Sequence, residues 1–529
     1  MLGLLPFIPP FAPLYAETHY RFKYFVSFLS KQEPEVLADA PHRVEPGESI
    51  PILLLAKDAH VAPAELLEVV AKVRTDQEEF TIPLTKASIT LRDQWWWTIC
   101  EVSTDGLAGW VEIDVQFTLR SVRGLHSYAT DNYRTSAHTP LNVYVAREPL
   151  PRLPGLMLGE GHSHSNATCD QVEFGIPPAA ARGLGRRLGL DFACITDHSY
   201  DLDDRVDDYL VNDPHLPKWR ALIAEIAELN SGPGMILVAG EEVTCRNREG
   251  RNIHCLVLGD AQYHPGSGDS AERWLKTRSE LSLADLIART SPDAAIVGAH
   301  VREHVPLLQR LLLGRGRWED DDIGERGLHA LQFWNGEIDD GFAAGKRAWI
   351  RALLQGHRLA VAAGNDAHGN FNRFRQLSVP FLLLRDDDHQ LFGRVRMGVF
   401  SAERSERAII EAIRKGRTIS TDGPIIAFYD GDRAIMGSIL TPPASLRLEA
   451  RSSHEFGGID RVEIWMGVIG ADHENLAAHW DGSGSMTWHN TFEAVDRRSH
   501  YVRAELITRR GDRDGHVHRA LTSPVWLGE

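Results

Sequence analysis

The sequence predicts an α/β domain that lies between two β-rich domains. Residues from about 40 to 147 and from about 426 onward carry short strand-like runs separated by Gly, Asp and Ser turns. Residues from about 156 to 425 instead alternate short apolar runs with helical stretches, as α/β domains do. The predicted boundaries are therefore 1–150 for a β-rich domain, 151–425 for the α/β domain and 426–529 for a domain similar to a β-sandwich.

The first domain is predicted from runs such as IPILLLA (50–56), WWWTICEV (95–102) and WVEIDVQFTL (110–119). Turn residues such as Asp105-Gly106 punctuate them, as in a β-sandwich. The apolar start of the chain has no basic segment and is broken by prolines, so we expect an arm packed on the fold rather than a signal peptide. Three prolines between Pro149 and Pro154 indicate a linker to the next domain.

The central domain is predicted from strands such as FACIT (192–196), MILVAG (235–240) and AAIVGAH (294–300). WRALIAEIAELN (219–230) and FAAGKRAWIRALLQG (342–356) are predicted helices between such strands. A segment of about 270 residues with this alternation suits a (β/α) barrel. The C-terminal runs LRLEARS (446–452), RVEIWMGVIG (461–470) and SPVWL (523–527) predict strands again.

Composition limits the classes of partner. The net charge of −16 argues against a broad surface for long nucleic acid, but it allows a small molecule or a short anionic substrate. The sequence holds no run of about 18 apolar residues, so no membrane span is expected. The five cysteines form no CxxC pair, which favours reduced thiols and a cytoplasmic protein. The β-rich domains are expected to shape a pocket or to support a homo-oligomer.

The strongest motif is GEGHSHSNATCD, in which His162 and His164 follow an apolar run. Residues two apart in a strand point to the same side, so the two imidazoles can grip one metal ion. On its own this pair is equally compatible with surface or structural histidines. Histidines and carboxylates recur, however, in five further segments, mostly where an apolar strand begins or ends. These are Asp197 and His198 in ACITDHS, Glu241 and Glu242 in VAGEEVT, His254 in RNIHCLVLG, His300 in IVGAH, and Asp366 and His368 in VAAGNDAH.

Burying so many titratable groups without a cation would be costly. Mixed imidazole and carboxylate ligands suit Mn, Zn or Fe. We therefore expect a metal centre.

The order HxH, TDH, GxE, in-strand His, AH and DAH resembles the PHP (polymerase and histidinol phosphatase) superfamily over residues 156–425. The flanking β-rich domains and the stretch GRTISTDGP (416–424) are most similar to its CehA/McbA-like branch. The resemblance implies a distorted (β/α)7 barrel with two or three divalent metal ions at the C-terminal ends of its strands.

The resemblance also implies a ligand set. His162, His164 and Asp366 would hold one ion, Glu242 would bridge it to a second ion bound by His254 and His300, and Asp170, His198 and His368 would form a third site. Glu242 is preferred to Glu241 because of its GxE spacing from Gly240. Asp170 departs from the family pattern, because it lies one residue further from His164 than usual and stands in CDQ rather than SDG.

The predicted reaction is hydrolysis of a phosphoester by a metal-activated hydroxide. His198 or His368 is the predicted proton donor to the leaving group, and Arg373 the predicted partner of an anionic substrate oxygen, with a salt bridge as the alternative role for Arg373. The alternatives are a carbamate or ester hydrolase that uses the same site and a catalytically inactive binding module. Asp197 is expected to orient a ligand histidine, and Gln332 stands where many relatives have a carboxylate.

Overall fold

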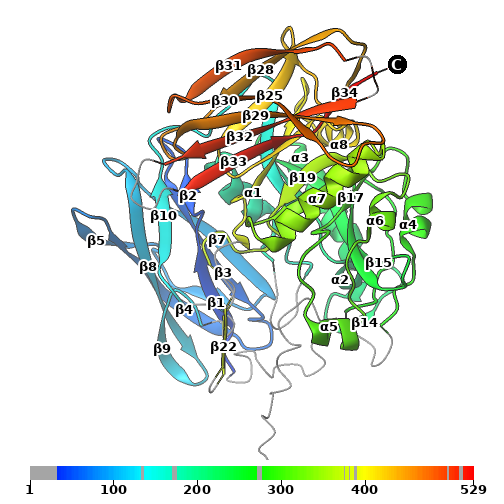
Figure 1. Ribbon diagram of the computed structural model, residues 1–529. Coiled ribbons are helices and arrows are strands. Elements are labelled where there is room, and N and C mark those ends of the chain that lie inside the picture. Colours follow the sequence, from blue (N-terminus) through cyan, green and yellow to red (C-terminus); the bar gives the residue numbers. More distant parts are fainter. Residues whose placement is uncertain are drawn as a thin grey trace, which may run out of the picture.

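The computed structural model describes residues 32–528 except 133–135, 137, 169–174, 271–276, 374–375, 380–381, 386–389, 497, 499 and 511–515. The chain folds into three regions that Figure 1 shows in blue to cyan, green to yellow, and orange to red. The predicted N-terminal arm and Asp170 fall outside the described residues. No described helix is long and apolar enough to cross a membrane.

The N-terminal region contains two sheets that enclose one apolar core. One sheet has the order β1-β3-β7, and the other has the order β2-β10-β8-β4-β5 with β6 and β9 at its sides. The strands are β1 (Glu35–Asp39), β2 (Arg43–Val44), β3 (Ile50–Lys57), β4 (Ala64–Arg74), β5 (Glu79–Pro83), β6 (Ile89–Leu91), β7 (Trp95–Val102), β8 (Gly109–Ser121), β9 (Gly124–Ala129) and β10 (Leu141–Val145).

The central region alternates strands and helices, which confirms the predicted mixed α/β class. Its elements are β11 (Leu156–His164), α1 (Pro178–Arg187), β12 (Phe192–Ile195), α2 (Ser199–Leu202), β13 (Asp204–Arg205), β14 (Asp208–Asn212), α3 (Pro217–Asn230), β15 (Ile236–Arg246), β16 (Asn252–Leu258), α4 (Leu283–Arg289), β17 (Ala295–Gly298), α5 (Leu307–Leu312), α6 (Asp320–Ile323), β18 (Ala330–Asn335), α7 (Asp340–Leu354), β19 (Ala360–Gly364), β20 (Ala367–His368), β21 (Gln376–Val379), β22 (Leu382–Arg385), β23 (Arg396–Phe400), α8 (Glu406–Arg414) and β24 (Thr418–Thr421).

Local sequence explains where helices α7 and α8 begin. The side chain of Asp339 accepts a hydrogen bond from the backbone N–H of Phe342 and caps α7, and Ser405 caps α8 in the same way through Ala408. Helix α7 then buries Phe342, Trp349 and other apolar residues in the core that it shares with β18. This packing fixes the strands on which the candidate site stands.

The strands of the central region follow the order β19-β18-β17-β16-β15-β12-β11 within one sheet. Among the described strands, no hydrogen-bonded ladder joins β19 back to β11, so a closed barrel is not established. The two strands still come close, because Gly161 and Gly364 lack side chains. A Cβ on Gly161 would lie 2.0 Å from the carbonyl oxygen of Ala363, and one on Gly364 would lie 2.6 Å from the Cβ of His162.

Strand β16 departs from simple βα alternation because it pairs antiparallel with both β15 and β17. A short turn over residues 247–251 joins β15 to β16 as a hairpin. The start of β16 therefore lies beside the end of β15, with His254 opposite Thr244. Because β16 runs in the opposite direction, His254 near its start lies at the same end of the sheet as the C-terminal ends of the parallel strands.

The C-terminal region is a second pair of sheets, and one of them is continuous with the central region. From β11 the sheet runs through β23, β24, β33 and β32 to β29 and β30, so hydrogen bonds cross the predicted boundary near residue 425. A separate sheet of order β26-β25-β28-β31 covers the same core. The strands are β25 (Ile425–Asp430), β26 (Arg433–Ala434), β27 (Ile439–Leu440), β28 (Ala444–Arg451), β29 (Gly458–Val468), β30 (Asn475–Asp481), β31 (Thr487–Ala494), β32 (His500–Arg509), β33 (Val517–Thr522) and β34 (Val525–Leu527).

A buried network of charges also joins the central and C-terminal regions. Arg503 donates to both oxygens of Glu474, at 2.8 and 2.6 Å, and to Glu505. The Nζ of Lys346, on α7, lies 2.5 Å from Glu505 Oε1. The guanidinium of Arg503 also lies between the rings of Trp349 and Trp465, at 5.6 and 5.7 Å from their centroids. Two positive and two negative charges are thus paired at this junction, which we call the Arg503 network.

Candidate metal centre

The last residues of β11 place His162 and His164 on one side of the strand, where both are buried. The Nδ1 of His162 lies 3.0 Å from Gln332 Oε1, so this amide oxygen accepts a hydrogen bond from Nδ1–H and the lone pair of the ring lies on Nε2. The Nε2 atoms of His162 and His164 lie 3.3 and 3.0 Å from Asp366 Oδ1. Three predicted ligands of the first site thus meet at one point.

Glu242, near the middle of β15, is the centre of the arrangement and is completely buried. Its two carboxylate oxygens contact five imidazoles, and each oxygen has its own group. Oε1 lies 2.7 Å from His254 and 3.0 Å from His300, whereas Oε2 lies 3.1 Å from His198, 3.2 Å from His162 and 3.4 Å from His164. The adjacent Glu241 makes its contacts elsewhere, because its oxygens accept from the backbone N–H of His264 and from Ser199 Oγ.

His254 reaches Glu242 because β16 runs antiparallel to β15. Its Nδ1 faces Glu242, while its Nε2 lies 2.8 Å from Asp269 Oδ2. Asp269 also accepts a hydrogen bond from Thr244 Oγ1 at 2.8 Å and one from Arg315 Nε at 3.1 Å. A carboxylate on the far nitrogen fixes the tautomer and orientation of a ligand histidine and raises its basicity.

Two residues of the cluster have a strained backbone. His300 has φ of 31° and Asp366 has φ of 51°, in the left-handed region that residues other than glycine seldom adopt. The neighbouring Asn365 is held in place by Glu160, which accepts hydrogen bonds from the Asn365 backbone and side chain. Strain of this kind persists only where the surroundings impose it, and here it turns both side chains toward Glu242 or the adjacent imidazoles.

His198 and His368 form the outer part of the cluster. The rings of His164 and His368 stack with centroids 4.0 Å apart, and His198 lies 4.5 Å from His164. Both nitrogens of His198 are buried. Its Nδ1 lies 3.1 Å from Glu242 Oε2 but without good hydrogen-bond geometry, and its Nε2 makes no hydrogen bond within the described residues. Asp170, the third predicted member of this group, lies outside the described residues.

The charges of the cluster favour ionised carboxylates. Burial opposes the ionisation of Glu242, but the imidazoles of His254, His162 and His198 outweigh it and hold the pKa of Glu242 well below its usual range. Asp366 behaves in the same way, since burial is outweighed by His162 and His164 and its pKa is held well below the usual range. Burial alone would lower the pKa of His198. The negative charge of Glu242 outweighs burial and raises this pKa to about 9.

Three groups of these residues bring one ligand atom each to within 4.8 Å of one another, which is close enough to hold a metal ion. They are His162, His164, Glu242 and Asp366; His198, Glu242 and His254; and His164, His198 and His368. The donors are nitrogen and carboxylate oxygen throughout, the combination that Mn, Zn and Fe accept. The described residues therefore contain a buried cluster able to bind metal ions.

Arg373 does not point into this cluster. Its guanidinium contacts Asp131 and Ser136 and donates to the carbonyl oxygen of Ala38 at 3.2 Å, all in the N-terminal region. The salt-bridge alternative is the arrangement that the structure contains, and the substrate-binding role stays a prediction. Arg302 likewise pairs with Glu319 and Asp320.

Three features of the centre were not predicted from the sequence. Asp269 and Arg315 lie in segments without a recognisable motif, and only folding brings them to His254. Gln332 stands at a position where a carboxylate was expected from the resemblance, and its amide oxygen orients His162. Asp197 was expected to orient a histidine; instead it accepts hydrogen bonds from Ser165 and Thr168 and so fixes the turn after His164.

Comparisons with known proteins do not identify a family. No family model matches the chain. No curated protein matches it either. Among solved structures, a cycloisomaltooligosaccharide glucanotransferase from Paenibacillus sp. complexed with cycloisomaltoheptaose is 8% identical with a TM-score of 0.16, over 93% of this chain and 71% of that one. A likeness this weak carries no argument about fold or function.

Proposed function

We propose that the chain is a metal-dependent hydrolase that acts on phosphoesters. The observation that carries the proposal is the buried carboxylate of Glu242, whose two oxygens face two separate groups of imidazoles. A carboxylate shared in this way is typical of a bridging ligand between two cations. The order of the motifs, which resembles the PHP superfamily, supports the same interpretation.

The donor set suits two ions. His162, His164, Asp366 and Glu242 Oε2 would hold one. His254 and His300, which both contact Glu242 Oε1, would hold the other. His198 and His368, which group with His164, would belong to a third position. Divalent cations at these positions would supply Lewis acidity, which lowers the pKa of water and polarises an ester oxygen. Two such ions would outweigh the charges of Glu242 and Asp366, and a positive site favours an anionic substrate such as a phosphoester.

The protein's own residues prepare the site. Gln332 and Asp269 accept hydrogen bonds from the far nitrogens of His162 and His254, so the opposite nitrogens present their lone pairs inward. Arg315, beside Asp269 and His254, adds positive charge to the same wall. His198 and His368 lie at the outer side of His164, where an imidazole can donate a proton to a leaving group.

The test begins with metal analysis of the purified chain, followed by assays on p-nitrophenyl phosphate, bis-p-nitrophenyl phosphate and a naphthyl carbamate with Mn or Zn. We expect bound metal and turnover of a phosphoester. His164→Ala should abolish turnover and strip metal while circular dichroism remains unchanged, and His479→Ala, an exposed histidine on β30, should alter neither. Turnover of the carbamate alone would replace the phosphoester proposal, and a folded chain without metal would favour a binding module.

A further inference from the structure

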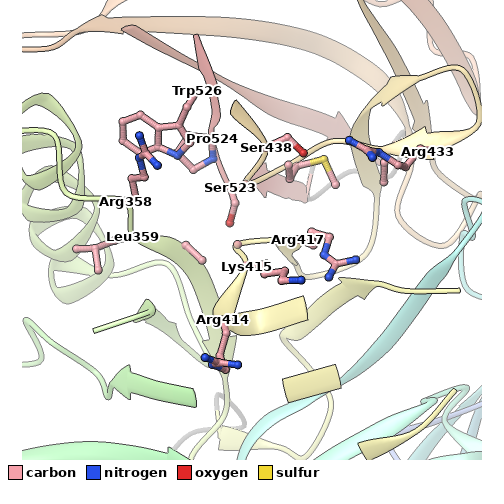
Figure 2. Close-up of a pocket in the computed structure, with 15 residues that line it drawn as sticks. Arg358, Leu359, Arg414, Lys415, Arg417, Arg433, Ser438, Ser523, Pro524 and Trp526 are labelled. Atoms are coloured by element: carbon pink, nitrogen blue, oxygen red, sulfur yellow. The ribbon is translucent and has the colours of Figure 1, made fainter. Parts of the chain in front are cut away.

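A second polar pocket lies at the opposite end of β19 from the imidazole cluster. It has a volume of about 460 Å³ and lies between the start of β19, the turn before β24 and the loops of the C-terminal region around β26, β27 and β34. Figure 2 shows Arg358 and Trp526 on one side of it and Arg417 and Arg433 on the other. The five-residue strand β19 separates it from Asp366 by roughly 16 Å of extended chain.

The lining of this pocket is strongly positive. It contains Arg358, Arg414, Lys415, Arg417 and Arg433 but no carboxylate, although the whole chain has a net charge of −16. Neither Arg358 nor Arg433 has a carboxylate partner among the described residues. Arg414 lies 4.0 Å from Asp293, and Lys415 and Arg417 share the carboxylate of Glu411, so the five cations of the lining meet only these two carboxylates among the described residues.

Two of the cations also have buried donors without acceptors. The Nε atoms of Arg414 and Arg417 are buried and make no hydrogen bond within the described part of the chain. Because these Nε atoms are buried, the terminal guanidinium nitrogens are the atoms left to meet an anion in the pocket. Phosphate oxygens suit guanidinium groups, which form paired, charge-assisted hydrogen bonds with them.

The backbone holds the cationic segments together. Gly437 has φ of 75°, and a Cβ there would lie 1.8 Å from the carbonyl oxygen of Lys415. The turn of residues 415–417 therefore packs directly on the loop that follows β26. This contact holds the backbone of the two cationic segments side by side.

The remaining wall is apolar. Trp526, Pro524, Met436 and Leu359 line it, and the guanidinium of Arg358 lies 5.9 Å from the centroid of the Trp526 ring. The volume falls in the range of pockets for organic ligands and exceeds the needs of an inorganic ion. A ligand with both an anionic and an apolar part fits such a lining.

We propose that this pocket binds a phosphorylated small molecule, with its phosphate on Arg417, Lys415 and Arg433 and its organic part against Trp526. The site would join the central and C-terminal regions through one ligand. It is independent of the proposed hydrolytic function, because it uses none of the imidazole cluster.

The test uses isothermal titration calorimetry on the full chain, with pyrophosphate as the probe at low ionic strength. All measurements are made in the His164→Ala background, so that binding at the imidazole cluster does not contribute. We expect Arg417→Gln/Arg433→Gln to weaken binding roughly tenfold or more, as the loss of charge-assisted contacts implies. Arg433→Gln alone, at an exposed position that cannot affect folding through a lost ion pair, should weaken it severalfold.

Arg120→Gln is the matched control, because Arg120 is an exposed arginine paired with Glu65 in the N-terminal region. It should leave the dissociation constant unchanged. The proposal fails if pyrophosphate does not bind at millimolar concentration, or if the pocket variants bind as tightly as their parent. Equal affinity for sulfate would overturn the assignment to phosphorylated ligands.

Discussion

The cluster around Glu242 and the Arg503 network are both buried groups of charges, but they differ in how their charges are paired. In the Arg503 network two cations face two carboxylates, and every charge has a partner. Around Glu242, buried nitrogens of His198 and His164 make no hydrogen bond within the described residues, and His300 and Asp366 are strained. Burial of charge alone therefore does not indicate a binding site, whereas buried ligands with unused lone pairs and a strained backbone do.

The largest effect is expected from Glu242→Gln. An amide cannot replace a carboxylate between two cations, so we expect loss of metal and a fall in turnover of at least about 1000-fold, equivalent to about 4 kcal/mol. Metal content and kcat are the measurements.

The matched control is Glu241→Gln. Its oxygens face His264 and Ser199 rather than the imidazole cluster, so metal content should persist. Full turnover in Glu242→Gln would remove Glu242 from the centre.

The corresponding change in the Arg503 network is Glu505→Gln. It leaves Arg503 with Glu474 only and removes the partner of Lys346, so the free energy of unfolding should fall by about 3 kcal/mol without change in metal content. Guanidinium unfolding followed by tryptophan fluorescence measures this. Asp481→Asn, at an exposed site on β30, should change the value by less than about 0.5 kcal/mol.

The effect of Glu505→Gln on the free energy of unfolding should also depend on pH. Burial opposes ionisation of Glu505, but Arg503 and Lys346 outweigh it and lower its pKa to about 2. A lowered carboxyl pKa stabilises the fold above pH 4.5, and this contribution is lost as pH falls toward 2. The wild-type chain should therefore lose its advantage over Glu505→Gln between these values, and a constant difference would contradict the pairing.

Arg373→Ala tests the buried ion pair between Arg373 of the central region and Asp131 of the N-terminal region. Its loss leaves Asp131 without the guanidinium, so we expect about 2 kcal/mol less stability. From the contacts in the structure we expect KM to change equally for anionic and neutral substrates. A larger rise for anionic substrates would instead support the substrate-binding role that the sequence suggested.

The smallest expected effect is that of Asp269→Asn. Asparagine keeps an oxygen near His254 Nε2 but loses the charge that raises the basicity of the imidazole, so metal affinity should fall about 10- to 100-fold. Competition with a chelator measures this change. Asp260→Asn, which alters a similar buried pair with His264 away from the cluster, should not affect metal affinity.

The sequence predicted the parts of this molecule that depend on local pattern. HxH in β11, the choice of Glu242 over Glu241 and the strand positions of His254 and His300 follow from period, spacing and resemblance, and the structure brings these side chains together. The contacts of Asp269 with His254 and of Gln332 with His162 depend on long-range packing. No local pattern encodes them.

The same limit applies to the architecture. The mixed α/β class with many strands could be predicted, because alternation and turn residues are local signals. The pairing of β24 with β33 could not, since about a hundred residues separate the two strands. The two flanking regions have similar sequence patterns, yet among the described strands only those of the C-terminal region share a sheet with the central region.

That shared sheet has a practical consequence for dissecting the protein. A truncation after residue 425 would remove β33 and leave β24 as an open edge, with its backbone N–H and C=O groups unpaired. It would also strip Tyr501, Leu521 and Trp526 from the apolar core that they share with α7. The central region should therefore aggregate when it is expressed without residues 426–529, and those residues belong to its folding unit.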